Sequence, residues 1–469
     1  MKLPKLNLGL CRQIQIGLVC NLMMLGCGFH EGWSTSMIPK LDGNDPTITV
    51  TPDQGSWIIN FMYVGVGLTS LIAPIFMEKI GRKWSLLSGT IPLTAGWLLL
   101  ALGQHHVTLY IGRFLAGLGC GIAYSITPVY IGEISSKKTR GPLGTMTAVL
   151  INTGMLIVSV IGLHVSRFTL GIISVWLPII FALTFVWMPE SPLFLARTNR
   201  LTEAERALKW SLGKDNVLEE LQQIERTISK DKTHTVGILI SFKRISERVN
   251  RKAFGIIIIL LCALSFTGAT PILAYQSYIY EEAGFDVSTN ASILVTGCAV
   301  VIAGICCVCV VKITGKKTLL LIAMPLCAVS LGTIAIFFTF WSYRIDMPNF
   351  RWIPTVFVVI FVVAYGLAIN PIPLAYAGEI FAPDVKLPAA MFCSIFYSVS
   401  TTVVTKLYQV LRETYGTYVP MWTLASLTIV IWIFIYLYVP ETEGKTLEDI
   451  QKEMAGQDKK PTDASVINS

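Results

Sequence analysis

Long apolar runs recur twelve times along this sequence and limit what it can fold into. Crossing a bilayer as a helix takes roughly 20 apolar residues, and there every backbone polar group must be satisfied internally. The chain of 469 residues is 53% hydrophobic and 14% charged, whereas soluble proteins are typically about 25% charged. We therefore expect an all-α protein embedded in the lipid bilayer. The expected transmembrane helices are 13–38, 54–77, 84–103, 108–132, 142–163, 168–188, 253–280, 289–311, 318–341, 352–378, 387–411 and 418–439.

One long charged interval, 189–252, separates the first six runs from the last six. Within it Thr202 precedes Glu205, and Asn216 precedes Glu219, by the three residues that are typical of a helix start. The interval therefore predicts amphipathic helices lying in water. Its expected apolar stripe consists of Leu218, Leu221, Ile224 and Ile228.

The two halves of the chain repeat one another. Three motifs recur at equivalent places, and in membrane transporters such duplication puts the substrate between the halves. We expect a six-helix bundle over 1–188, a helical linker over 189–252, a second bundle over 253–440 and a tail over 441–469. The matched motifs are Gly81-Arg82-Lys83 with Gly315-Lys316-Lys317, Glu133 with Glu379, and Pro189-Glu190-Ser191-Pro192 with Pro440-Glu441-Thr442.

The basic residues indicate orientation rather than nucleic-acid binding. The net charge is +8, but the Lys and Arg residues gather in short loops that share one side with both termini and with the linker. The positive-inside rule places that side in the cytoplasm. The eleven cysteines lie in or beside apolar runs, which argues against a disulfide framework, and no cleavable signal peptide is visible. The loop residues are Lys79, Arg82, Lys83, Lys137, Lys138, Arg140, Lys312, Lys316 and Lys317.

Several motifs resemble one transporter family closely. Residues 78–83 resemble the signature between spans two and three of the major facilitator superfamily. The stretches 112–121, 128–133 and 439–447, with Pro371-Ile372-Pro373 before Glu379, resemble the sugar porters within it. The resemblance covers essentially the whole chain except its tails. Residues 32–34, 39–41 and 378–381 are most similar to the trehalose-transporter-like branch of animal sugar porters.

The resemblance implies a cytoplasmic gate of ion pairs between span ends and the helical linker, closing the inner side in the outward-facing state. The alternative is simple positive-inside topology, which accounts for part of the same charge. The implied pairs join Arg82, Lys83 and Arg140 to Glu133 and Glu190, and Lys316 and Lys317 to Glu379 and Glu441.

The expected substrate cavity departs from the family pattern. Aligned with the family's cavity amides and indole, this chain has Ala148, Leu264, Ser265, Thr270, Val300, Leu374, Tyr397 and Ser398. Because each buried hydrogen bond contributes about 0.5–1.5 kcal/mol, we expect weak binding of an ordinary hexose. Ordinary helix packing remains the alternative for each polar residue. The candidate substrate-binding residues are Asn152, Thr267, Thr270, Tyr275, Gln276, Asn370, Tyr397 and Ser398, with Tyr275 at a family gate position.

Three ionisable residues in the apolar runs suggest either proton coupling or a role in the outer vestibule. His30 is nearest the position where proton-coupled relatives carry an acid, and Arg113 is that acid's usual partner. Glu31 is one residue along, a rotation of about 100° on a helix, which directs it away from Arg113 and toward the outer mouth. We therefore expect passive transport with His30 and Glu31 in the outer vestibule. Asn290 begins a glycosylation sequon expected in an outer loop.

These patterns predict a monomeric facilitative transporter of a small sugar, trehalose or a hexose, in the plasma membrane. No catalytic nucleophile, metal cluster or nucleotide loop stands out, so we expect no enzyme, cofactor or metal. The alternatives are a transporter of another small polar solute, a proton-coupled sugar symporter and a nutrient sensor that has lost transport.

Overall fold

The structure, a computed structural model, describes residues 8–43, 47–136, 139–233, 248–284, 288–345, 347–381 and 383–443. Twelve helices in these ranges are long and apolar enough to cross a membrane, as the sequence predicted. Within the described residues the secondary structure is helical, without strands. The helices of the N-terminal half are α1 Leu8–Leu41, α2 Pro52–Ile80, α3 Arg82–Leu102, α4 His106–Ile134, α5 Arg140–His164 and α6 Arg167–Phe185. Those of the C-terminal half are α11 Arg248–Phe266, α12 Ala269–Ala283, α13 Thr289–Thr314, α14 Lys316–Ser342, α15 Ile353–Ala364, α16 Pro371–Glu379, α17 Pro383–Tyr415 and α18 Tyr418–Tyr438.

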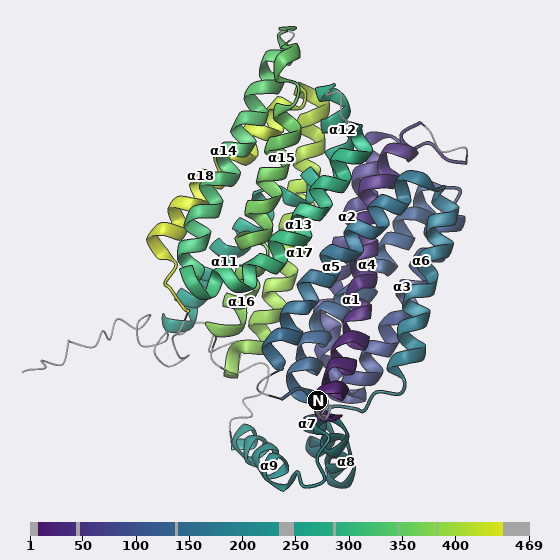
Figure 1. The fold of residues 1–469 in the computed structure, drawn as a ribbon, viewed down its shortest axis with the longest axis vertical. Helices are drawn as coiled ribbons and strands as arrows, with labels where there is room; N and C mark the ends of the chain where they lie inside the picture. The colour runs from purple at the N-terminus through teal and green to yellow at the C-terminus, as the bar shows by residue number, and fades with distance from the viewer. Residues whose placement is uncertain are drawn as a thin grey trace, which may run out of the picture.

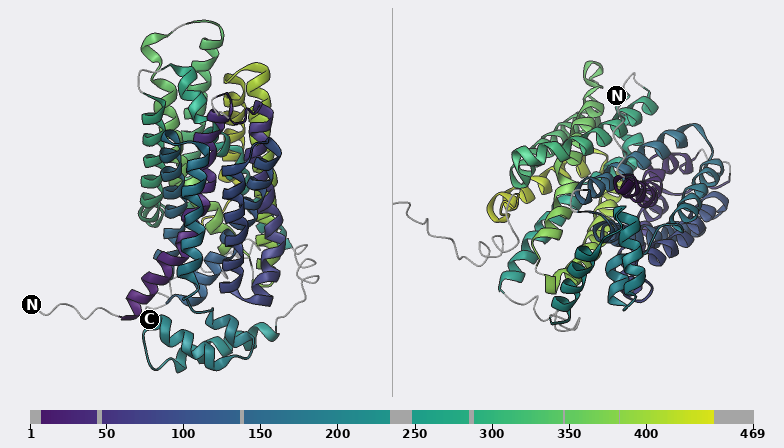
Figure 2. Two further views of the ribbon diagram at one scale, coloured as in Figure 1. Left: turned by 90° about the vertical axis from the view of Figure 1, so that its right-hand side faces the viewer. Right: turned by 60° about the horizontal axis from the view of Figure 1, so that its bottom comes forward.

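The two sets of helices form two bundles that lie side by side (Figure 1). They meet along α2 against α17, α5 against α13, and α1 against α12. The linker helices lie beneath the bundles, beside the start of α1 (Figure 2). We call this side of the molecule the terminal face and the opposite side, where α1 ends and α2 begins, the distal face.

Two of the spans in the C-terminal half are interrupted. The seventh span, expected to be one helix, breaks between α11 and α12 at Gly268, whose φ of 78° favours glycine. The tenth span contains a π-helical turn, Tyr365–Ile369, before Pro371 restarts the helix as α16. Such turns are frequent at functional sites, and irregular backbone at membrane depth needs protein or a cavity around it.

Small residues bring the helices of the N-terminal half into close contact. A Cβ added at Gly117 would lie 2.0 Å from the Met62 carbonyl oxygen of α2, and one added at Gly119 would lie 2.4 Å from Leu93 of α3. Only glycine allows both approaches. The glycine-rich run of α4 is therefore a packing surface against two neighbouring helices.

The described part of the linker contains three helices, α7 Pro192–Arg197, α8 Leu201–Leu212 and α9 Leu218–Thr233. The expected start at Thr202 is wrong, because α8 already begins at Leu201 with Arg200 before it. Asn216 does accept a hydrogen bond from the Leu218 backbone at the start of α9. Leu221, Ile224 and Ile228 pack against a small core formed by α7 and α8, whereas Leu218 is exposed.

Candidate transport site and gates

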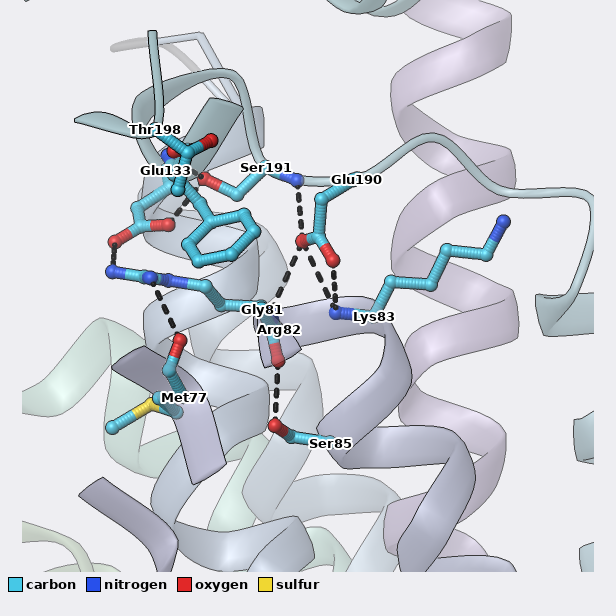
Figure 3. Close-up of polar contacts among 10 residues, drawn as sticks. Met77, Gly81, Arg82, Lys83, Ser85, Glu133, Glu190, Ser191 and Thr198 are labelled. Carbon is cyan, nitrogen blue, oxygen red and sulfur yellow. Dashed lines mark hydrogen bonds and ion pairs between the residues drawn. The ribbon is translucent and has the colours of Figure 1, made fainter. Parts of the chain in front are cut away.

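On the terminal face of the N-terminal half, the chain leaving α6 is held against the start of α3 (Figure 3). The Glu190 carboxylate accepts hydrogen bonds from the backbone N–H groups of Arg82 and Lys83, both at 3.1 Å. The Arg82 guanidinium forms an ion pair with Glu133 at 2.8 Å and also donates to the Met77 carbonyl. Glu133 in turn accepts a hydrogen bond from the Ser191 hydroxyl. Carboxylates thus satisfy the free N–H groups at the start of α3.

The C-terminal half repeats this arrangement residue for residue. Glu441 accepts hydrogen bonds from the backbone N–H groups of Lys316 (3.1 Å) and Lys317 (2.9 Å). The Lys316 ammonium binds Glu379 at 2.6 Å and Glu443 at 3.0 Å, and Glu379 accepts a hydrogen bond from Thr442. Tyr130 and Tyr376 complete the repeat by donating to the carbonyls of Pro189 and Pro440.

One glycine in each half makes the arrangement possible. Gly81 and Gly315 have φ values of 89° and 81°, which side chains rarely adopt. A Cβ at Gly81 would lie 2.4 Å from a Glu190 carboxylate oxygen, and one at Gly315 would lie 2.7 Å from Glu441.

Each set of contacts lies within one half and its own exit segment, as in the expected pairs, so it does not join the halves. The contacts differ from the expected gate in two ways. Lys83 contributes its backbone N–H, while its ammonium lies over the Trp84 ring at 5.6 Å. The contacts are present while the distal face is closed, as shown below, so they are not confined to an outward-facing state. The side chain of Arg140 lies outside the described residues.

Glu190 follows α6 and lies outside the transmembrane helices, and its side chain is partly buried. Removal from water raises the pKa of its carboxyl above the ordinary value, and the backbone donors of Ser191, Lys83 and Arg82 offset only part of this. Glu190 is therefore protonated more readily than an exposed glutamate.

At the centre of the molecule, residues from both halves surround one carboxylate. Glu31 of α1 accepts a hydrogen bond from the Tyr124 hydroxyl of α4 at 2.7 Å. Tyr63 of α2 meets Tyr397 of α17 edge to face, with ring centroids 6.2 Å apart. Thr270 at the start of α12 lies near both phenols, and Tyr365 lies in the π-helical turn nearby. We call Glu31, Tyr63, Tyr124, Thr270, Tyr365 and Tyr397 the central cluster.

Arg113 does not pair with this carboxylate among the described residues. Its guanidinium donates to the carbonyls of His30 (2.5 Å) and Ile58 (3.2 Å) and to the Ser34 hydroxyl (3.0 Å). His30 is fully buried and stacks on Trp97 with ring centroids 4.0 Å apart. Because the distal face is closed in this structure, as described below, the expectation that His30 and Glu31 line the outer vestibule stays a prediction. His30 packs inside the N-terminal half, and Glu31 turns toward Tyr124 at the centre.

The other candidate residues fall into four places. Asn152 and Gln276, both buried, line a small cavity between α5 and α13 with the Val300 side chain. Asn370 is half-buried where the π-helical turn ends, and buried Ser398 lies against Gly67 of the other half. Thr267 is fully buried and donates to the Ala263 carbonyl of its own helix, so it supports the break in the seventh span.

Two further positions differ from expectation. Ser265, aligned with a family glutamine, bridges α11 to α17 through the Ser400 and Thr401 hydroxyls, at 2.8 and 3.3 Å. Asn290 is exposed but lies in the first turn of α13, with Ser292 buried. The sequon is therefore helical and does not lie in a loop.

Hydrogen bonds between the halves close the distal face. Lys406 of α17 forms an ion pair with Asp53 of α2 and donates to Ser56 at 3.1 Å. Tyr278 of α12 donates to Asp42 at the end of α1. Thr35 and Ser277 add backbone contacts between α1 and α12. Tyr275, the expected gate residue, is buried there and stacks on Tyr408.

Sequence reasoning missed several of these residues. Tyr63 and Tyr124 were not singled out, because a tyrosine in an apolar run has no distinctive pattern. The cross-half pair of Asp53 and Lys406 had one available signal, a lysine inside a transmembrane run, which requires a partner or an aqueous path.

Two six-helix halves with a polar cluster at their interface define a membrane transporter of the major facilitator type. The solved structures agree: the proton:xylose symporter XylE bound to 6-bromo-6-deoxy-D-glucose matches with a TM-score of 0.76 at 17% identity, covering 95% of this chain and 99% of that one. The inward-open xylose transporter XylE from E. coli matches with the same score and identity, covering 94% and 99%.

The chain belongs to the sugar transporter family. The family described as "Sugar (and other) transporter" matches residues 14–454. The facilitated trehalose transporter Tret1 of Apis mellifera ligustica is 30% identical over 95% of this chain and 88% of that protein. Tret1 of Anopheles gambiae is 29% identical over 95% of this chain and 56% of its own length, so the chain spans about half of some relatives.

Proposed function

We propose that the protein is a facilitative transporter of a small sugar that works by alternating access. The observation that carries this proposal is the central cluster, whose polar groups come from both halves and meet at their interface. A solute bound there contacts both halves at once, so rocking of the halves exposes it to one side and then the other. The similarity to facilitated trehalose transporters supports a sugar.

The composition of the cluster favours a solute with many hydroxyl groups. The Glu31 carboxylate accepts hydrogen bonds, and the phenols of Tyr63, Tyr124 and Tyr397 both donate and accept. Their rings supply apolar faces for the C–H surface of a sugar. In this proposal a carboxylate and phenols replace the amides of other sugar porters, with Thr270 and Asn370 beside them. We therefore propose trehalose ahead of glucose as the substrate.

The terminal face is assigned to the cytoplasm, because the basic residues beside α3 and α14 lie on it. The ion pairs on this face hold the segment that leaves each half against its own bundle, and we propose that these segments act as part of the cytoplasmic gate. We also propose that the protein works as a monomer in the plasma membrane and has no enzymatic activity.

A proton-coupled symporter is the second candidate, and the half-buried Glu31 carboxylate favours it. Coupling requires protonation that differs between the two states of the transporter. We favour passive transport, because the Arg113 guanidinium already donates hydrogen bonds to main-chain carbonyls. It therefore has no ion pair with Glu31 to form and break.

Uptake by purified protein in liposomes tests the proposal. Radiolabelled trehalose and glucose are supplied separately, with protein-free liposomes as the control. Saturable trehalose entry that stops at equilibrium supports facilitative transport. Entry of neither sugar, alongside entry of another small solute, contradicts the sugar assignment.

A further inference from the structure

A cavity of about 320 Å³ lies on the distal face between the two halves, apart from the central cluster. The end of α1 and the start of α2 line it from one half. The end of α17 and helix α12 line it from the other. Its size is at the lower end of small-molecule sites, which span about 300–1,000 Å³. Its ionisable and aromatic lining residues are Asp42, Tyr275, Tyr278, Glu282, Arg412 and Glu413.

Hydrogen-bonded carboxylates and a stacked guanidinium give this cavity a defined polar lining. Asp42 accepts a hydrogen bond from Tyr278 at 3.0 Å, and Glu282 accepts one from Thr417 at 2.6 Å. The Arg412 guanidinium lies 4.5 Å from the centre of the Tyr278 ring. Among the described residues it forms no ion pair within 4 Å, and it lines the cavity.

Tyr275 supplies a second, independent observation. Its side chain is 4% exposed, it lines the cavity, and its hydroxyl has no hydrogen-bond partner among the described residues. Leaving a buried hydroxyl unpaired costs about 1–3 kcal/mol. The oxygen has essentially no accessible surface, so a ligand hydroxyl in the cavity would remove that cost only after the Tyr275 side chain turns toward it.

We propose that this cavity is a second binding site for a sugar ring, formed only while the distal face is closed. Acceptors on Asp42 and Glu282, donors on Arg412 and the amphipathic Tyr275 match a ligand whose hydroxyl groups donate and accept. An organic cation is the competing ligand, because the lining has three carboxylates and one guanidinium, although Arg412 already covers the face of Tyr278. The proposal rests on the proposed sugar transport, since the ligand is taken from the same class.

The lining residues make this site depend on whether the distal face is open or closed. Asp42 and Tyr278 belong to different halves, as do the start of α2 and Arg412, so opening the distal face separates the two walls of the site. A sugar bound there stabilises the closed state by its binding free energy. The site would therefore limit net entry when sugar is abundant on the distal side.

Protection of an introduced thiol tests the site directly. Glu413→Cys places a thiol on an exposed lining residue, and Thr414→Cys, the next residue, is exposed outside the lining. Reaction with a membrane-impermeant maleimide is followed with trehalose, glucose or tetramethylammonium added, and the unmodified chain gives the background of native thiols. At a sugar concentration about ten times its Kd, the reaction at Glu413→Cys should slow about tenfold. The reaction at Thr414→Cys should not change.

Adding Arg412→Gln separates local binding from closure of the whole face. If the sugar sits in the cavity, this second change abolishes protection at Glu413→Cys. Protection that survives Arg412→Gln overturns the site, because it then comes from sugar bound at the centre. Protection by tetramethylammonium alone, or by no probe, also overturns it. Sugar uptake by the unmodified chain tests the proposed function separately, so the two failures are distinguishable.

Discussion

The ion pair between Arg82 and Glu133 should contribute more to stability than its repeat between Lys316 and Glu379. We expect Arg82→Ala to destabilise the protein by roughly 2–4 kcal/mol. The lost charge-assisted bond contributes about 1.5–3 kcal/mol, and the bond to the Met77 carbonyl about 0.5–1.5 kcal/mol. The large value follows from burial, since the two side chains are only 8% and 12% exposed.

The corresponding change in the C-terminal half, Lys316→Ala, should cost less, roughly 1–2 kcal/mol, because solvent screens a more exposed pair. Its partner Glu379 is 38% exposed. Glu379 keeps its hydrogen bond from Thr442, as Glu133 keeps its bond from Ser191, so the predicted difference does not come from these hydroxyl groups. The two halves share a geometry but differ in burial, in the basic residue and in the second partner of Lys316, Glu443.

Denaturant unfolding of purified protein in detergent measures both costs. A double-mutant cycle with Glu133→Gln then isolates the Arg82–Glu133 interaction, and Arg200→Ala, in an exposed ion pair of α8, serves as a matched control. A coupling energy near zero for Arg82 and Glu133 would refute the reasoning. So would an equal or larger cost for Lys316→Ala.

Three further changes test other parts of the structure. Gly81→Ala should displace Glu190 from the start of α3 and slow transport several-fold, whereas Gly132→Ala, where a Cβ meets nothing within 4 Å, should have little effect on uptake. Lys406→Met should weaken the contacts that close the distal face. A thiol introduced on that face should then be labelled faster. Glu190→Gln should flatten the pH dependence of stability. With a raised folded pKa, Glu190 stabilises the fold most below the ordinary carboxyl pKa of about 4.3 and loses that contribution as pH rises through the raised value. The free energy of unfolding, measured with urea between pH 4 and 7, should therefore change less with pH in Glu190→Gln. The same pH dependence in both proteins would contradict this last expectation.

The sequence predicted the twelve spans and the repeated terminal-face motifs because both depend on local information. The length of an apolar run predicts a transmembrane helix, and Gly81 and Gly315 indicate the same turn in each half. The pairing of Glu190 with backbone N–H groups, instead of lysine side chains, required the path of the chain after α6. The sequence alone does not determine that path.

The centre was harder to predict because it depends on how the helices are rotated. Glu31 and His30 are neighbours, yet one faces Tyr124 across the interface and the other stacks on Trp97. Which of them is central follows from close packing of α1 against its neighbours. Ser265 illustrates the same limit: alignment placed it in the cavity, and in the fold it joins two helices.

Trehalose flux through liposomes carrying the protein, with and without an imposed proton gradient, tests the central claim most directly. We predict entry to equilibrium and no accumulation under the gradient. Glu31→Gln should retain exchange, because an amide still accepts the Tyr124 hydrogen bond. Tyr63→Phe and Tyr124→Phe should each raise KM for trehalose about twofold to tenfold, through loss of one hydrogen bond. Gradient-driven accumulation that disappears in Glu31→Gln would contradict passive transport, and unchanged kinetics in both tyrosine variants would contradict the central cluster as the transport site.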